Sequence, residues 1–156
     1  MSIKNLEKKG TVSKISPLEK ERYIEFFTNA WQENFDHAKH TQKSFPRWSI
    51  ISGYYAMHDR AKLFLATLNV QVDFNVHTTT VQALKAVAKD KELIALFEIG
   101  HKEFITFAND LAQGKNERVK AQYYTGTAYM QKEYQKQANE FLEETVKPFL
   151  ERIEGL

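Results

Sequence analysis

Hydrophobic residues recur at helical spacing over most of the chain, and the longest unbroken example runs from residue 44 to residue 69. Its apolar positions step by three and four residues, which places them along one stripe of an amphipathic helix. The stripe consists of Ile50, Tyr54, Met57, Ala61, Phe64 and Leu68. We therefore expect a helix that contributes this stripe to the core, with Ser44 as its N-cap ahead of Pro46.

The opposite side of this predicted helix carries two large aromatic residues, Trp48 and Tyr55, together with Asp59. Aromatic side chains gathered on a face that meets only water are unusual. We therefore expect the helix to contact a partner on each of its two sides.

Four further stretches have the same helical spacing. One starts at the capping pair Ser16-Pro17 and fades after His40, and a short one follows the threonines at 78–80. A third carries apolar residues from 93 to 111 and is expected to end at Gly114, a residue type favoured after helix C-termini. The last helix lies between 127 and 149 and is expected to kink near Lys147, because Pro148 removes a backbone hydrogen bond.

Two segments are predicted to lack regular structure. Residues 1–15 are rich in lysine and poor in apolar residues, which indicates a flexible N-terminal arm. Residues 70–79 alternate in the manner of a strand, but one strand without a partner is unstable, so we interpret them as a connecting loop. The pattern as a whole predicts a single all-α domain over residues 16–156, an antiparallel bundle of four long helices and one short helix.

Composition narrows the classes of protein. Three prolines and six glycines leave little room for a turn-rich β architecture, and the absence of cysteine excludes disulfides, thiolate zinc sites and cysteine nucleophiles. No apolar run approaches the ~20 residues that cross a bilayer, and the first residues lack the apolar core of a signal peptide. We therefore expect a cytoplasmic protein without a membrane partner. A formal net charge of +2 is too small to indicate nucleic-acid binding by itself.

Two groups of residues have spacings found among metal ligands. Glu98 and His101 form a Glu-x-x-His pair, while Glu33, His37 and His40 share one helix face. A di-metal bundle needs two Glu-x-x-His pairs, and the sequence contains one. We therefore interpret both groups as hydrated surface residues and predict no metal and no cofactor.

A third group has the chemistry of a nucleotide or RNA contact. It comprises His58, His77, Lys115, Arg118, Lys120, Tyr123 and Tyr124. Arginine holds phosphate through two parallel hydrogen bonds, and tyrosine stacks on bases. These residues converge if the segment after Gly114 folds back across the bundle. The alternative is an ordinary surface loop whose tyrosines anchor it in the core.

Three short segments, taken in order along the chain, are similar to sequence motifs of a known protein family. Residues 52–62 read SGYYAMHDRAK, residues 77–78 are His-Thr, and residues 118–123 read RVKAQY. They resemble the HEPN family of all-helical prokaryotic domains. The similarity is to its paired aromatics on the second helix, its histidine before a short helix, and its arginine, alanine and tyrosine ahead of the last helix. The resemblance extends from about residue 18 onward.

The resemblance implies a homodimer that binds nucleotides or RNA, and some members pair with a small nucleotidyltransferase as toxin and antitoxin. On this basis Trp48 and Tyr55 are expected in the dimer interface. The expected nucleotide or RNA contacts are Arg118, Lys120, Tyr124, His58, His77 and Lys115.

Many HEPN members are metal-independent ribonucleases in which a histidine follows the arginine after four to six residues. Here positions 123–125 are Tyr, Tyr and Thr, so the histidine is absent. A tyrosine with a pKa of ~10 is a poor general base at neutral pH, whereas an imidazole near ~6.5 accepts and donates protons. The leading hypothesis is a binding module without standard ribonuclease activity. The alternatives are an active ribonuclease toxin rearranged around Arg118 and Tyr123, and a structural dimer that binds nothing.

Overall fold

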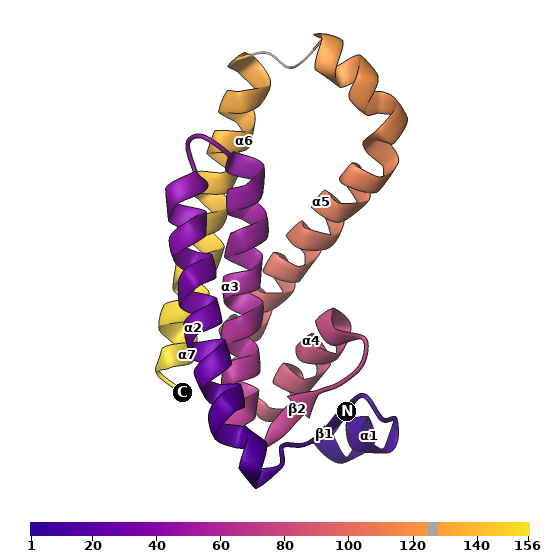
Figure 1. The fold of residues 1–156 in the computed structure, drawn as a ribbon, viewed down its shortest axis with the longest axis vertical. Coiled ribbons are helices and arrows are strands. Elements are labelled where there is room, and N and C mark those ends of the chain that lie inside the picture. Colours follow the sequence, from indigo (N-terminus) through magenta and orange to yellow (C-terminus); the bar gives the residue numbers. More distant parts are fainter. Residues whose placement is uncertain (125–127) are drawn as a thin grey trace.

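The computed structural model describes the backbone of residues 1–124 and 128–156, and the side chains of residues 1–107 and 131–156. Its elements in chain order are α1 (Ile3–Lys8), β1 (Val12–Lys14), α2 (Pro17–Thr41), α3 (Pro46–Thr67), β2 (Val70–Val72), α4 (Val76–Val87), α5 (Lys91–Tyr124), α6 (Ala128–Phe141), a π-helical turn (Leu142–Val146) and α7 (Lys147–Glu154). The fold is therefore mostly helical, with one small two-stranded sheet. Figure 1 shows α2 and α3 side by side, with α6 and α7 running along the same pair.

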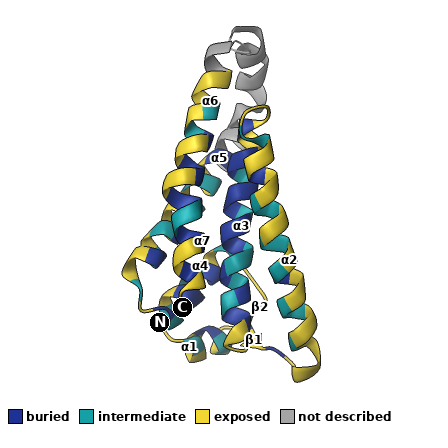
Figure 2. Cartoon of the chain, turned by 90° about the vertical axis from the view of Figure 1, so that its left-hand side faces the viewer, coloured by how far each residue is buried: buried dark blue, intermediate teal, exposed yellow. Residues whose placement is uncertain are grey.

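Helix α3 is the centre of the molecule. Four members of its predicted stripe, Ile50, Tyr54, Met57 and Ala61, are at most 1% exposed, which confirms this part of the prediction. Leu68, the last member, is 46% exposed because it lies just beyond the end of the helix. Figure 2 shows buried residues concentrated on α3, while the outward sides of α2 and α6 are exposed.

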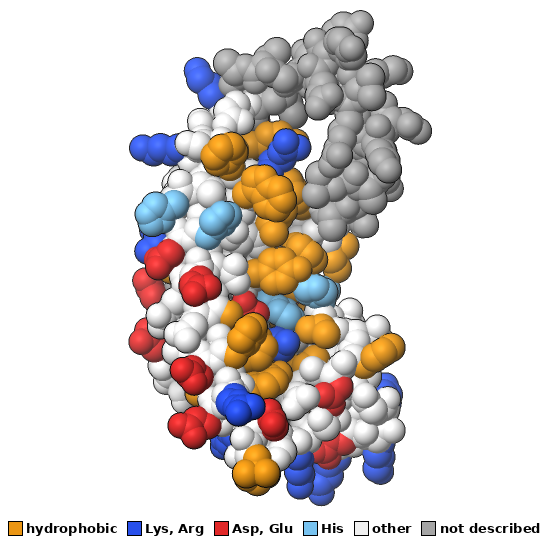
Figure 3. Space-filling model, viewed as in Figure 1, with side chains coloured by type: hydrophobic (Ala, Val, Ile, Leu, Met, Phe, Trp, Pro, Cys, Tyr) orange, Lys and Arg blue, Asp and Glu red, His pale blue; other side chains and the backbone are white. Residues whose placement is uncertain are grey.

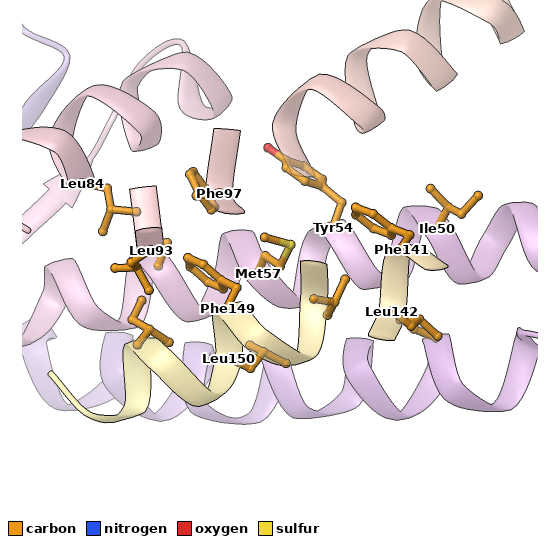
Figure 4. Close-up of a cluster of buried hydrophobic side chains, with 14 of the residues drawn as sticks. Ile50, Tyr54, Met57, Leu84, Leu93, Phe97, Phe141, Leu142, Phe149 and Leu150 are labelled. Atoms are coloured by element: carbon orange, nitrogen blue, oxygen red, sulfur yellow. The ribbon is translucent and has the colours of Figure 1, made fainter. Parts of the chain in front are cut away.

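The main core forms where α5, α6 and α7 close over α3. Figure 4 shows Met57 of α3 close to Phe97 of α5 and Phe149 of α7, and Tyr54 of α3 beside Phe141 of α6. The rings of Phe97 and Phe149 lie 5.4 Å apart between centroids. Close approach between helices depends on two glycines. A Cβ on Gly53 would lie 3.2 Å from side-chain atoms of Leu142 and Val146, and one on Gly100 would lie 2.8 Å from the Met57 sulfur. These glycines let the neighbouring helices pack tightly against α3.

The N-terminal segment has regular structure, so the interpretation of residues 1–15 as an arm with little structure is wrong. Helix α1 buries Leu6 completely, and strand β1 pairs antiparallel with β2, with Val12 opposite Val72. The interpretation of residues 70–79 as a loop is also wrong, because β1 supplies the partner strand that the argument lacked. Leu6, Val12, Val70, Val72, Leu65 and Ala83 form a second, smaller core.

Three helix boundaries or faces differ from the expectation. Helix α5 extends to Tyr124 instead of ending at Gly114, since a glycine inside a helix costs only about 1 kcal/mol and does not stop it. The sequence predicts a kink near Lys147. At this place the structure has the π-helical turn Leu142–Val146, which ends immediately before Lys147. The apolar spacing that predicts a helix after Ser16-Pro17 includes Leu18 and Phe26, yet on α2 these side chains are 89% and 64% exposed.

A search of the described helices for one that is both long and apolar enough to cross a membrane finds none.

Candidate functional site

Five of the seven residues in the candidate nucleotide or RNA group, which includes the catalytic candidates Arg118 and Tyr123, lie outside the residues whose side chains the structure describes. They are Lys115, Arg118, Lys120, Tyr123 and Tyr124. The site can therefore be built from the other two, His58 and His77, and from the groups around them.

The structure brings His58 of α3 and His77 of α4 together, with 4.9 Å between their ring centroids. The Tyr54 hydroxyl lies 2.8 Å from Nδ1 of His77. A third imidazole, His101 of α5, lies 6.3 Å from the Tyr54 ring between centroids. Helices α3, α4 and α5 thus each contribute one histidine around a single buried tyrosine.

Phe104 completes this group from α5. Its ring stacks on Tyr54 at 4.5 Å and 13° between planes, and it lies 5.1 Å from His77 and 5.6 Å from Tyr55 between centroids. Tyr54 is fully buried, whereas Tyr55, His77 and Phe104 are half-buried. We call the six residues Tyr54, Tyr55, His58, His77, His101 and Phe104 the aromatic–histidine face. Its half-buried rings are the parts that a ligand can reach.

Figure 3 shows this region from outside. Hydrophobic side chains gather in a strip along the middle of the view with some of the histidines beside it, while most acidic side chains lie to the left of the strip over α2. Such a surface offers apolar contact and hydrogen bonds with little local negative charge.

His58 is the inner member of the face and is only 3% exposed. Its Nε2 lies 3.3 Å from the Thr80 hydroxyl, which already donates to the carbonyl of Val76 at 2.7 Å. The threonine proton is therefore used, so Nε2–H of His58 donates to the threonine oxygen. His58 is packed inside the protein and does not present its ring to a ligand.

Burial lowers the pKa values of His77 and His101, and both rings are consequently neutral at pH 7. For His77 the further causes are the nearby His58, His101 and Lys62. For His101 they include His58, while Glu98 acts in the opposite direction. Like charges repel one another in a partly buried space, so the neighbouring imidazoles disfavour protonation of His77, and His58 disfavours protonation of His101.

The hydrogen bond between Tyr54 and His77 has a defined direction. Burial raises the pKa of Tyr54, followed by the influence of Tyr55 and Asp59, so its hydroxyl keeps the proton and donates to Nδ1 of His77. The proton of the neutral His77 ring then lies on Nε2. His77 is therefore a hydrogen-bond donor at its free nitrogen and is poorly placed to act there as a base.

His101 was missed as a member of this site, because its sequence spacing pairs it with Glu98 as a metal motif. Glu98 instead forms an ion pair with Lys85. Nε2 of His101 is buried and finds no hydrogen-bond partner among the described residues. The sequence does contain a signal for His101. It follows Gly100 and precedes Phe104 by three residues, so the helical period places it near the side of the helix that faces α3.

Within residues 1–107 and 131–156, no three His, Cys, Asp or Glu side chains have a geometry that could hold a metal ion. The three imidazoles instead contact aromatic rings and hydroxyl groups. The arrangement can stack a planar group and donate a hydrogen bond to it.

The two residues predicted in a dimer interface have different environments. Trp48 is 59% exposed, and Phe45, at the residue before α3, is 62% exposed. Tyr55 is half-buried against Phe104 and His77 within its own chain. Trp48 is thus free to contact another molecule, while much of the Tyr55 ring already has contacts.

Comparison with known proteins adds no relative. No protein-family model matches the chain, and searches of curated proteins and of solved structures found no match.

Proposed function

We propose that this protein is a HEPN-like antiparallel bundle of four long helices and one short helix that binds nucleotide or RNA without cleaving it. The observation that carries the proposal is the aromatic–histidine face, where half-buried Tyr55, His77 and Phe104 surround the buried ring of Tyr54. Bases are recognised by stacking on aromatic rings, which contributes about 1–3 kcal/mol per base.

The electrostatics of the face suit a base better than a phosphate. Its two partly exposed imidazoles, His77 and His101, are neutral at pH 7, because burial lowers their pKa values. Nε2–H of His77 offers a donor to an acceptor on the base edge. Phosphate contacts would come from Arg118 and Lys120, which follow Phe104 on the same helix α5.

The same geometry supports binding over catalysis. Nδ1 of His77 accepts a hydrogen bond from the Tyr54 hydroxyl, His58 is 3% exposed, and no histidine follows Arg118 at the position typical of HEPN ribonucleases. General base catalysis needs an unprotonated group within hydrogen-bond reach of the substrate hydroxyl. Exposed Trp48 supports the further proposals of a homodimer and of a small nucleotidyltransferase as an alternative partner.

The test measures binding and cleavage of one labelled single-stranded RNA in the presence of a chelator. We expect Phe104→Ala to weaken binding about tenfold, because a stacking platform is lost. Arg118→Ala should weaken binding for all sequences and reduce the slope of log affinity against log salt by about one. Phe26→Ala, at an exposed position on α2, is the matched control and should bind as the wild type does.

Three outcomes would contradict the proposal. Binding that is unchanged in both variants would remove the site. Cleavage that vanishes in Arg118→Ala would show an active ribonuclease with a rearranged site. A monomeric mass in sedimentation equilibrium at micromolar concentration, measured on the same sample, would contradict the homodimer.

A further inference from the structure

A second row of aromatic residues follows the seam between α2 and α3, apart from the aromatic–histidine face. Its rings succeed one another at steps of four along α2, so they lie on one side of that helix. A cation lies over each ring, at centroid distances of 4.5 Å for Lys62 on Phe27, 5.9 Å for Arg60 on Trp31 and 4.6 Å for Lys39 on Phe35. Cations in this position are held by the negative faces of the rings.

Beside two of these rings the surface opens into a hollow of about 610 Å³ between α2, α3 and α7. Small-molecule sites typically have volumes of about 300–1,000 Å³. Trp31 and Phe35 form one wall, and the buried side chains of Leu63 and Leu150 form the apolar floor. The hollow therefore has the size and the apolar lining of a ligand site.

Arg60 is the charge that sets the chemistry of this hollow. Its side chain is half-buried, and among the described residues no carboxylate oxygen lies within 4.0 Å of it. The two lysines that line the hollow differ in this respect, because Lys39 and Lys147 each pair with an acid three or four residues earlier in the chain. A partly desolvated guanidinium without a carboxylate has five donors available for an anion.

We propose that this hollow binds a small amphiphilic monoanion, a single carboxylate on an apolar body. The carboxylate accepts two parallel hydrogen bonds from Arg60, and the apolar body lies between Trp31 and Leu150. Glu151 and Glu154 line the α7 side and repel a ligand with several negative charges. This wall excludes polyphosphates and RNA from the hollow, so the proposal stands independently of nucleotide binding at the aromatic–histidine face.

The burial of Arg60 is consistent with this role. Burial lowers its pKa, and Glu154 only partly offsets that influence. A bound carboxylate would restore some of the stabilisation that the charge loses on leaving water.

The test uses octanoate as the probe and 1-octanol as its neutral counterpart. The chain has two tryptophans, so Trp48→Phe leaves Trp31 as the single reporter, in the wall of the hollow. We expect octanoate to give a saturable change in Trp31 emission. Arg60→Met, which keeps an apolar stem, should weaken octanoate binding by at least about tenfold and leave the weaker binding of octanol unchanged.

Lys62→Met is the matched control. It also removes a half-buried cation stacked on an aromatic ring of α2, but Lys62 does not line the hollow. Its affinity for octanoate should equal that of the protein with Arg60 and Lys62 intact. Circular dichroism of both variants checks that they remain folded.

If Arg60→Met does not fold, the salt dependence of octanoate binding to the folded parent protein tests the proposal instead. Octanoate binding should weaken between low and high salt while octanol binding does not, because only octanoate interacts with a partly exposed charge. Four results would overturn the proposal: equal octanoate affinity with and without Arg60, equal affinity for octanoate and octanol, displacement of octanoate by ATP, or the absence of any saturable change in the folded protein.

Discussion

Helix α3 has two flanks on which aromatic rings lie beside basic side chains, and the basic side chains differ: histidines on one flank, arginine and lysines on the other. On the α4–α5 flank, the aromatic–histidine face places the neutral imidazoles of His77 and His101 near Tyr54, and its rings are packed closely. On the α2–α7 flank, permanent cations lie over the rings of α2 beside an open hollow. The comparison shows that the kind of side chain decides whether a partly buried nitrogen group keeps its charge. An imidazole has an ordinary pKa near neutrality, so a lowered pKa makes it neutral at pH 7, whereas guanidinium and ammonium groups have ordinary pKa values far above neutrality and remain cations even though burial lowers theirs as well.

Removal of a ring from each flank should reveal the difference in packing. Tyr54→Ala deletes a fully buried ring, and we expect a loss of about 3–5 kcal/mol in the free energy of unfolding. Trp31→Ala deletes a half-buried ring at the open hollow and should cost roughly half of that or less. Urea denaturation of both variants at pH 7.5 measures the two losses. Equal losses would show that the flanks do not differ in packing.

Between pH 7 and pH 5, the stability of the folded protein should depend on the histidine flank and not on the flank that carries Arg60. The pKa values of His77 and His101 are lowered in the folded state, so protonation favours the unfolded state. The stabilising contribution is complete above the unfolded value of 6.5 and is lost as the pH falls below it.

We therefore expect the melting temperature to fall from pH 7 to pH 5, and to fall less in the double variant His77→Gln/His101→Gln. Arg60→Met, on the other flank, should keep the slope of the wild-type protein. Melting curves recorded by circular dichroism measure both slopes. A double variant with the wild-type slope would assign the acid sensitivity to other groups.

The smallest expected effect is that of a charge on one flank on the pKa of a histidine on the other. Lys62 lies over Phe27 on the α2 side, yet its charge is one of the causes that lower the pKa of His77 on the α4 side. Lys62→Met should therefore raise the pKa of His77. An NMR titration of the histidine ring signals detects this shift, with His40→Gln, at an exposed position on α2, to assign an unrelated signal. A downward shift would mean that the variant changes the packing of the cluster.

Much of the helical core could be predicted because α3 carries its burial pattern within one continuous segment. Ile50, Tyr54 and Met57 are core residues at the predicted spacing. The pairing of Val12 with Val72 could not be predicted, because a two-residue period in a short segment says nothing about a partner so distant in the chain. Without that partner, residues 70–72 were assigned to a loop.

The candidate site was only partly predictable for the same reason. The sequence singled out His58 and His77, and the fold does bring them together. Phe104 is one of the apolar residues between 93 and 111 whose spacing predicts a helix, and that spacing does not indicate that its half-buried ring completes the face. The hollow could not be predicted, because Arg60 and Trp31 lie on different helices and no spacing within one helix indicates their contact.

The pairing of β1 with β2 has a consequence during synthesis, because β1 is made well before its partner strand. Synthesis proceeds from the N-terminus, so Leu6 and Val12 leave the ribosome before the segment that covers them, which begins at Leu65 and extends through α4. For the time needed to translate that interval, two side chains that end fully or almost fully buried remain in water, where an edge strand can also meet other chains. The α2–α3 hairpin, whose contacts are closer in sequence, can form in the meantime and hold the start of the chain near the place where β2 will emerge.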